Sequence, residues 1–207
     1  MTTGTETHWE KIYGRRADDE VSWYEPSPDL SLKLVREALA QGARSVIDVG
    51  GGTSRMVDAL LEEELDRIAV LDVSEIALDR AKQRLGSNAG RVEWIHGDIA
   101  KLSDVGMFDV WHDRALFHFL TSAGARTHYG RLLDKTVSAK GFAIIATFGP
   151  EGPETCSGLP VERYDAVALG RELGDGFELR DSRTVDHLTP HGKHQQFMYA
   201  VFGRSDR

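Results

Sequence analysis

The chain has 207 residues, a length at which we expect one domain with a sizeable core rather than two. Its net charge of −8 repels a phosphate backbone, which disfavours nucleic acid, and its single cysteine excludes an internal disulfide and offers no metal site. The polar N-terminus and the lack of an apolar run of about 20 residues predict a soluble, cytoplasmic protein without a membrane span.

From about residue 28 the sequence alternates between helical and strand patterns. Strands that alternate with helices form parallel sheets through right-handed crossovers, so we expect an α/β fold. The last two strands flank a turn at 190–192, which predicts antiparallel pairing. In chain order the predicted elements are helix 28–42, strand 45–49, helix 54–64, strand 67–72, helix 74–85, strands 92–95 and 108–111, helix 122–138, strand 142–147, helix 161–173, and strands 177–185 and 196–202.

A glycine-rich turn follows the first predicted strand. Gly50 and Gly52 remove side chains where the chain turns sharply, and the next helix start offers amide donors to a ligand. A dinucleotide site would place a third glycine where this chain has Arg55, which disfavours a nicotinamide cofactor. Asp48, just before the glycines, would repel phosphates but attract the ammonium of an amino-acid moiety. The turn therefore favours a positively charged ligand.

Two further acids follow the next two strands. Asp72 ends the second strand, where a carboxylate can accept hydrogen bonds from both hydroxyls of a ribose. Asp98 follows the third strand, where it can accept from an adenine amino group while Ile99 packs on the ring. With Asp48, three acids fall at successive strand ends, on the edge where open α/β sheets bind ligands.

The Asp48-x-Gly50-x-Gly52 element, followed by Asp72 and Asp98, resembles the class I, Rossmann-like methyltransferases that use S-adenosylmethionine. The resemblance covers nearly the whole chain and implies a seven-stranded, mostly parallel sheet flanked by helices, with an antiparallel C-terminal strand pair. It implies that Asp48 and the glycines hold the methionine portion, that Asp72 holds the ribose, and that Asp98 holds the adenine. The implied cofactor-binding residues are Asp48, Gly50, Gly51, Gly52, Asp72, Val73, Asp98, Ile99, Asp113, Arg114, Trp23 and Tyr24.

The segment 111–119, after the fourth strand, resembles the part of the family that carries methyl transfer. His118 and Asp113 are catalytic candidates here, because a histidine or carboxylate beside the methyl group could accept a proton. The alternatives are a structural histidine with satisfied hydrogen bonds and an acid that caps the next helix. Arg114 either lines the cofactor pocket or pairs with a carboxylate at the surface.

Residues 1–27 resemble the N-terminal caps of small bacterial family members, which fold over the cofactor. Trp23 and Tyr24 could cover the sulfonium with their π faces, although aromatic residues near a helix start also pack into cores. We find no repeat or linker, so residues 1–207 are expected to form a single methyltransferase domain. The loop at 149–160 is either a substrate lid or a long connection.

We therefore expect an S-adenosylmethionine-dependent methyltransferase that acts on a small molecule, without nucleic acid, membrane or metal partners. Methyl transfer from a sulfonium is an in-line displacement, so the protein mainly has to align the acceptor, and a general base is optional. Two alternatives stay open: a protein lysine methyltransferase, whose basic substrate an acidic surface would attract, and a module that binds the cofactor without catalysis. The sequence leaves the acceptor and the oligomeric state open.

Overall fold

The computed structural model describes residues 4–205, which form one seven-stranded sheet and a separate two-stranded hairpin. The strands are β1 Ser45–Val49, β2 Arg67–Asp72, β3 Glu93–His96, β4 Phe108–Arg114, β5 Val137–Phe148, β6 Thr155–Cys156, β7 Leu159–Pro160, β8 Phe177–Leu188 and β9 His194–Arg204. The sheet order is β3-β2-β1-β4-β5-β9-β8. The first five strands in this order pair in parallel, and β9 runs antiparallel to β5 and β8. The predicted fold class is confirmed.

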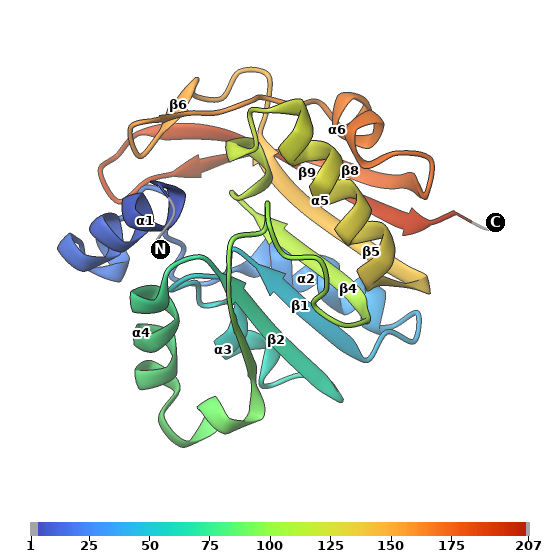
Figure 1. Cartoon of the computed structure of the whole chain (residues 1–207), viewed down its shortest axis with the longest axis horizontal. Helices are drawn as coiled ribbons and strands as arrows, with labels where there is room; N and C mark the ends of the chain where they lie inside the picture. Colours follow the sequence, from blue (N-terminus) through green and yellow to red (C-terminus); the bar gives the residue numbers. More distant parts are fainter. Residues whose placement is uncertain (1–3, 206–207) are drawn as a thin grey trace.

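Helices cover both faces of the sheet, with α5 in front and α2 behind in Figure 1. The helices are α1 Gly4–Arg15, α2 Asp29–Leu39, α3 Met56–Leu60, α4 Glu75–Leu85, α5 Ala123–Thr136 and α6 Ala166–Leu173. One buried cluster joins the apolar faces of α2, α3 and α4 to the sheet, and a second joins those of α5 and α6 to its other face. Between residues 4 and 205, no helix has the length and apolar character needed to cross a membrane.

Local sequence signals set the ends of α4 and α5. The side chain of Ser74 accepts a hydrogen bond from the Ala77 amide and caps α4, and Ser122 caps α5 in the same way. Gly86 ends α4 with a φ of 57°, a conformation that glycine adopts without steric cost. The predicted extent of these two helices is confirmed to within two residues.

Several elements differ in length from the predictions. Strand β5 spans Val137–Phe148 where 142–147 was predicted, and α6 begins at Ala166 rather than at 161; α3 and β4 differ next to the glycine turn and the strand ends. Helix α3 spans only Met56–Leu60, and just ahead of its start Arg84 donates to the carbonyl oxygens of Thr53 and Ser54, at 3.1 and 2.7 Å, which holds them out of the helix. Strand β4 continues to Arg114 because its pairing with β5 extends through three more residues. Tertiary contacts therefore shorten α3 at its start and lengthen β4.

The N-terminal helix α1 packs beside α4 (Figure 1). The Glu10 carboxylate accepts from the Ile76 amide at 3.3 Å, and Arg80 donates to the Arg16 carbonyl at 2.7 Å. These bonds fix α1 and the residue that follows it against the sheet domain. The predicted domain at 1–207 and its cap at 1–27 include residues 1–3 and 206–207, which lie outside the described residues.

The loop at 149–160 forms the hairpin of β6 and β7. Cys156 on β6 is buried, and its sulfur lies 4.0 Å from the Ser22 hydroxyl. The loop therefore packs against the N-terminal segment.

A buried hydrogen-bond chain attaches the end of β4 to α5. Trp111 Nε1 donates to the Tyr129 hydroxyl at 2.7 Å, and that hydroxyl donates to Asp113 Oδ2 at 2.7 Å. All three side chains are buried. Because buried polar groups are costly without partners, Tyr129 satisfies one donor and one acceptor at once.

The Tyr129→Phe variant should therefore lower the free energy of unfolding by about 1–3 kcal/mol, because it strands the Trp111 N–H and one Asp113 oxygen. Urea unfolding followed by tryptophan fluorescence measures this change. A loss of unfolding free energy smaller than about 0.5 kcal/mol, the range of ordinary surface substitutions, would contradict the importance of these buried hydrogen bonds.

Candidate active site

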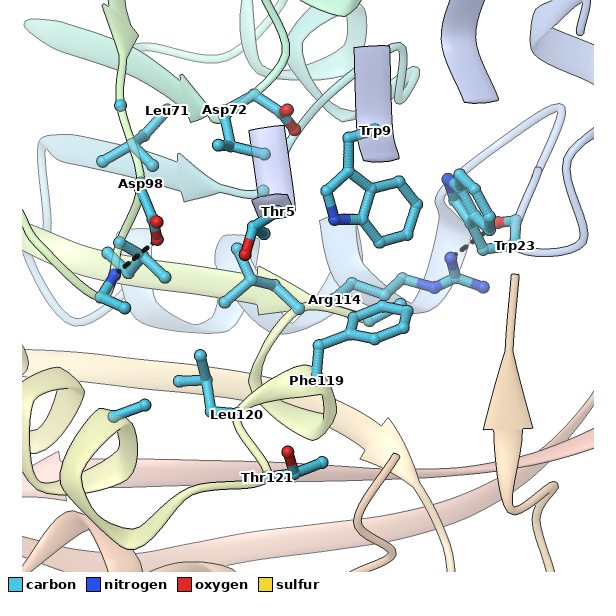
Figure 2. A pocket seen from close by; sticks show the side chains of 18 of the residues that line it. Thr5, Trp9, Trp23, Leu71, Asp72, Asp98, Arg114, Phe119, Leu120 and Thr121 are labelled. Atoms are coloured by element: carbon cyan, nitrogen blue, oxygen red, sulfur yellow. Dashed lines mark hydrogen bonds between the residues drawn. The ribbon is translucent and has the colours of Figure 1, made fainter. Parts of the chain in front are cut away.

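A cavity of about 230 Å³ lies over the carboxyl ends of β1, β2 and β4. Figure 2 shows Asp98 at one side of it and Trp9, Trp23 and Phe119 grouped at the other. Its lining comes from six parts of the chain: Thr5, Trp9 and Tyr13; Trp23; Gly50; Leu71, Asp72 and Val73; Gly97, Asp98, Ile99 and Ala100; and Arg114, Ala115, Leu116, Phe119, Leu120, Thr121, Ser122 and Ala125. The structure thus gathers the sequence-predicted strand ends around one space.

The glycine turn after β1 leaves no room for side chains. Gly50 and Gly52 have φ values of 71° and 49°, in the left-handed region that glycine favours. A Cβ atom on Gly50 would lie 2.6 Å from Leu116 Cδ1, and one on Gly51 would lie 2.6 Å from Asp48 Oδ2. The backbone of the turn can therefore approach a ligand closely, as the sequence predicted.

Asp72, at the end of β2, places a buried carboxylate in the cavity lining. Its Oδ1 accepts from the Ser74 amide at 2.8 Å. The pKa of Asp72 is raised to about 7: burial and, to a smaller extent, the nearby charge of Asp48 raise it, while backbone donors at Ser74, Gly52 and Val73 oppose the shift. A ligand that donates hydrogen bonds to this carboxylate would favour its ionised form.

Asp98 and Ile99 follow β3 and line the cavity, and Asp98 lies on the side away from Trp23 (Figure 2). Asp98 Oδ1 accepts from the Ala100 amide at 3.0 Å, and its Oδ2 lies 3.2 Å from Lys101 Nζ. Ile99 is buried and presents an apolar side chain. The pair offers an acceptor beside a flat apolar surface.

Aromatic side chains close the opposite side. The ring of Trp9 makes edge contacts with those of Trp23 and Phe119, at centroid distances of 5.6 and 5.0 Å, and Tyr13 lies 6.2 Å from Trp23. The sequence analysis included Trp23 but missed the other three as site residues. A signal was present: Thr5, Trp9 and Tyr13 are four residues apart and share one face of α1.

A smaller cavity of about 30 Å³ adjoins the first and shares Trp23, Gly50 and Arg114 with it. Asp48 and Tyr24 line this smaller cavity. Asp48 is 3% exposed, and its Oδ1 lies 2.7 Å from His112 Nδ1. Its Oδ2 is buried without a hydrogen-bond partner, so this oxygen is available to a donor.

Arg114 connects the end of β4 to the N-terminal segment. Its guanidinium donates to the Trp23 carbonyl at 2.8 Å and to the Tyr199 hydroxyl at 2.8 Å, and it pairs with Glu25 at 2.8 Å. It also lies over the Phe197 ring, 4.7 Å from the centroid. Arg114 therefore lines the cavity with its guanidinium bound to the N-terminal segment and to β9.

The two predicted catalytic residues lie outside both cavities. His118 is fully buried, its Nδ1 accepts from the Phe148 amide at 3.3 Å, and burial lowers its pKa to about 3, helped by the Arg114 charge. A neutral ring with Nδ1 as acceptor carries its proton on Nε2, so it has no free lone pair for a second proton. Asp113 accepts from the amides of Leu116 and Phe117 and caps that turn.

Comparisons with known proteins agree with this geometry. Residues 46–135 match the family model of a methyltransferase domain. The solved structure of Burkholderia thailandensis 1,6-didemethyltoxoflavin-N1-methyltransferase, with S-adenosylhomocysteine bound, has a TM-score of 0.75 at 20% identity. The match covers 98% of this chain and 88% of that chain. A protein studied in the conversion of a disulfide bond into a thioacetal group during echinomycin biosynthesis has a TM-score of 0.77 at 18% identity. That match covers 97% of this chain and 93% of the other.

A curated relative, the Mus musculus eEF1A lysine and N-terminal methyltransferase, is 25% identical over 99 residues. These residues make up 48% of this chain and only 14% of that relative. By strand order and these structural matches, the chain has the class I, Rossmann-like methyltransferase fold. Residues 46–135, the part of the chain that matches the methyltransferase-domain model, lie within this fold.

Gly51→Ala tests how tightly the turn is packed. It should lower the free energy of unfolding by about 1–3 kcal/mol, because the new methyl group would collide with Asp48 Oδ2 and with Val70 Cγ1. Gly90→Ala is the matched control, since nothing lies within 4 Å of a Cβ atom there. Urea unfolding compares the two variants, and equal stabilities would contradict the packing described.

Proposed function

We propose that this enzyme transfers the methyl group of S-adenosylmethionine to a small-molecule acceptor. The observation that carries the proposal is the cavity of about 230 Å³, lined by strand-end acids and covered by α1 and its aromatic side chains. This volume lies slightly below the range of drug-sized ligand pockets and leaves little room for a macromolecular segment.

The residues present fit the proposed cofactor. The unpartnered, buried Oδ2 of Asp48 beside the glycine turn suits the methionine ammonium. Asp72 suits the ribose hydroxyls, and Val73 lines the cavity next to it. Asp98 and Ile99 suit the amino group and the ring of adenine.

The bound cofactor would supply a methyl group on a sulfonium that is already a good leaving group. The chain then has to hold the acceptor in line and exclude water. Trp9, Trp23 and Phe119 present π surfaces and apolar edges suited to both tasks, and π faces attract cations. Because His118 and Asp113 lie outside the cavities, we assign neither a proton-transfer role and propose an acceptor that is nucleophilic without a base from these two residues.

A protein acceptor is the second candidate. The match to a eukaryotic lysine and N-terminal methyltransferase supports it, and the net charge of −8 would attract a basic segment. The small, covered cavity favours the first candidate.

Calorimetric titration tests the cofactor. The chain should bind S-adenosylmethionine and not NAD(P), and Asp72→Ala should weaken this binding at least about 10-fold, because a charged hydrogen-bond acceptor is lost. Preference for NAD(P), or no binding at all, would reject the proposed function.

A methyl-transfer assay tests the acceptor. Transfer of a radiolabelled methyl group to a low-molecular-mass fraction, and not to protein, would support the small-molecule acceptor, and the reverse result would favour the protein acceptor.

The affinity for the adenosine portion should depend on pH through Asp72. With a pKa of about 7, Asp72 is mostly protonated at pH 6 and mostly ionised at pH 8, and the ionised form accepts both ribose hydroxyls. Affinity for 5′-methylthioadenosine, which lacks an amino-acid group, should therefore rise about 10-fold from pH 6 to pH 8. Asp72→Asn should remove this dependence, and an unchanged slope in the variant would contradict the assignment.

A further inference from the structure

His112 lies beside Asp48 in the sheet, since these two residues pair in the register of β1 and β4. Its Nδ1 is 2.7 Å from Asp48 Oδ1, and its Nε2 is 2.9 Å from the Ser31 hydroxyl on α2. All three residues are at most 3% exposed. Both ring nitrogens therefore have partners, which fixes the orientation of the imidazole.

The hydrogen bonds continue from Ser31 toward the N-terminal segment. Ser31 also bonds the Tyr199 hydroxyl on β9, and that hydroxyl accepts from Arg114 Nε at 2.8 Å. A neutral imidazole with its proton on Nδ1 lets every group in this series donate toward Asp48. The series thus links the Asp48 carboxylate to Arg114, which holds the Trp23 carbonyl.

The arrangement of a serine, a histidine and an aspartate is also that of a hydrolytic triad. Ser31 is 1% exposed and lines neither cavity, so no substrate can reach its hydroxyl. Asp48 does line the smaller cavity, and its second oxygen has no partner. In this hydrogen-bonded series, the group that a ligand can reach is therefore the Asp48 carboxylate and not the Ser31 hydroxyl.

We propose that His112 is a positioning residue, which holds one oxygen of Asp48 so that the other faces the ammonium group of the cofactor. This inference rests on the proposed function. Without His112, the carboxylate could rotate about its side-chain torsions, and the ammonium would have to fix it at an entropic cost. With His112, the carboxylate is already in place before the cofactor binds.

Two ligands separate this role from a purely structural one. S-adenosylhomocysteine carries the amino-acid group, and 5′-methylthioadenosine lacks it. In calorimetric titrations of the full chain, His112→Phe should weaken S-adenosylhomocysteine binding at least about 10-fold and change 5′-methylthioadenosine binding less than about twofold. His112→Asn keeps a donor near the Nδ1 position, so it should restore S-adenosylhomocysteine binding to within about threefold of the wild type.

His128→Asn is the matched control, because His128 bonds the Leu102 carbonyl at 2.8 Å and lines neither cavity. It should leave both affinities unchanged. Equal weakening of both ligands in His112→Phe, or unchanged S-adenosylhomocysteine binding, would overturn the positioning role alone. Failure of the wild-type chain to bind either ligand would overturn the proposed function and this inference with it.

Discussion

The site depends on the parallel pairing of β1 with β2 on one side and with β4 on the other. In parallel strands the carboxyl ends meet at one edge of the sheet, so residues far apart in sequence become neighbours. Asp48 pairs with Val70 in one register and with His112 in the other. A one-residue slip of β1 would turn Asp48 to the opposite face and separate it from both the glycine turn and the imidazole.

The cover of the cavity depends on the last residue of β4. Arg114 is available at that position only because β4 pairs with β5 for three residues more than the sequence pattern predicts. From there its guanidinium binds the Trp23 carbonyl and Glu25, which brings the N-terminal segment over the strand ends. The antiparallel strand β9 supports the same arginine through Tyr199. The added length of β4 therefore provides the arginine that holds the N-terminal segment over the cavity.

The sequence predicted the sheet and the strand-end acids because both follow from local patterns: apolar runs, capping residues and an acid beside glycines. It could not place His112 or Phe119, because their partners are distant in the chain. His112 bonds a residue 81 positions away, and Arg114 bonds one 91 positions away. His118 showed the converse, since a histidine in the expected segment lies in the core beside Phe148. Sequence position alone does not determine which face of a turn a side chain occupies.

The charges around the two cavities affect how readily the proposed cofactor and its demethylated product exchange. Asp48 and Asp72 are both buried, and the pKa of Asp72 is raised to about 7, mainly by its burial and in part by the nearby charge of Asp48. Arg114 is paired with Glu25, so its charge is largely balanced locally. A positively charged ligand relieves the repulsion between the acids. The proposed cofactor has a sulfonium charge that its demethylated product lacks, so methyl transfer removes part of the attraction that holds it and favours exchange of product for fresh cofactor.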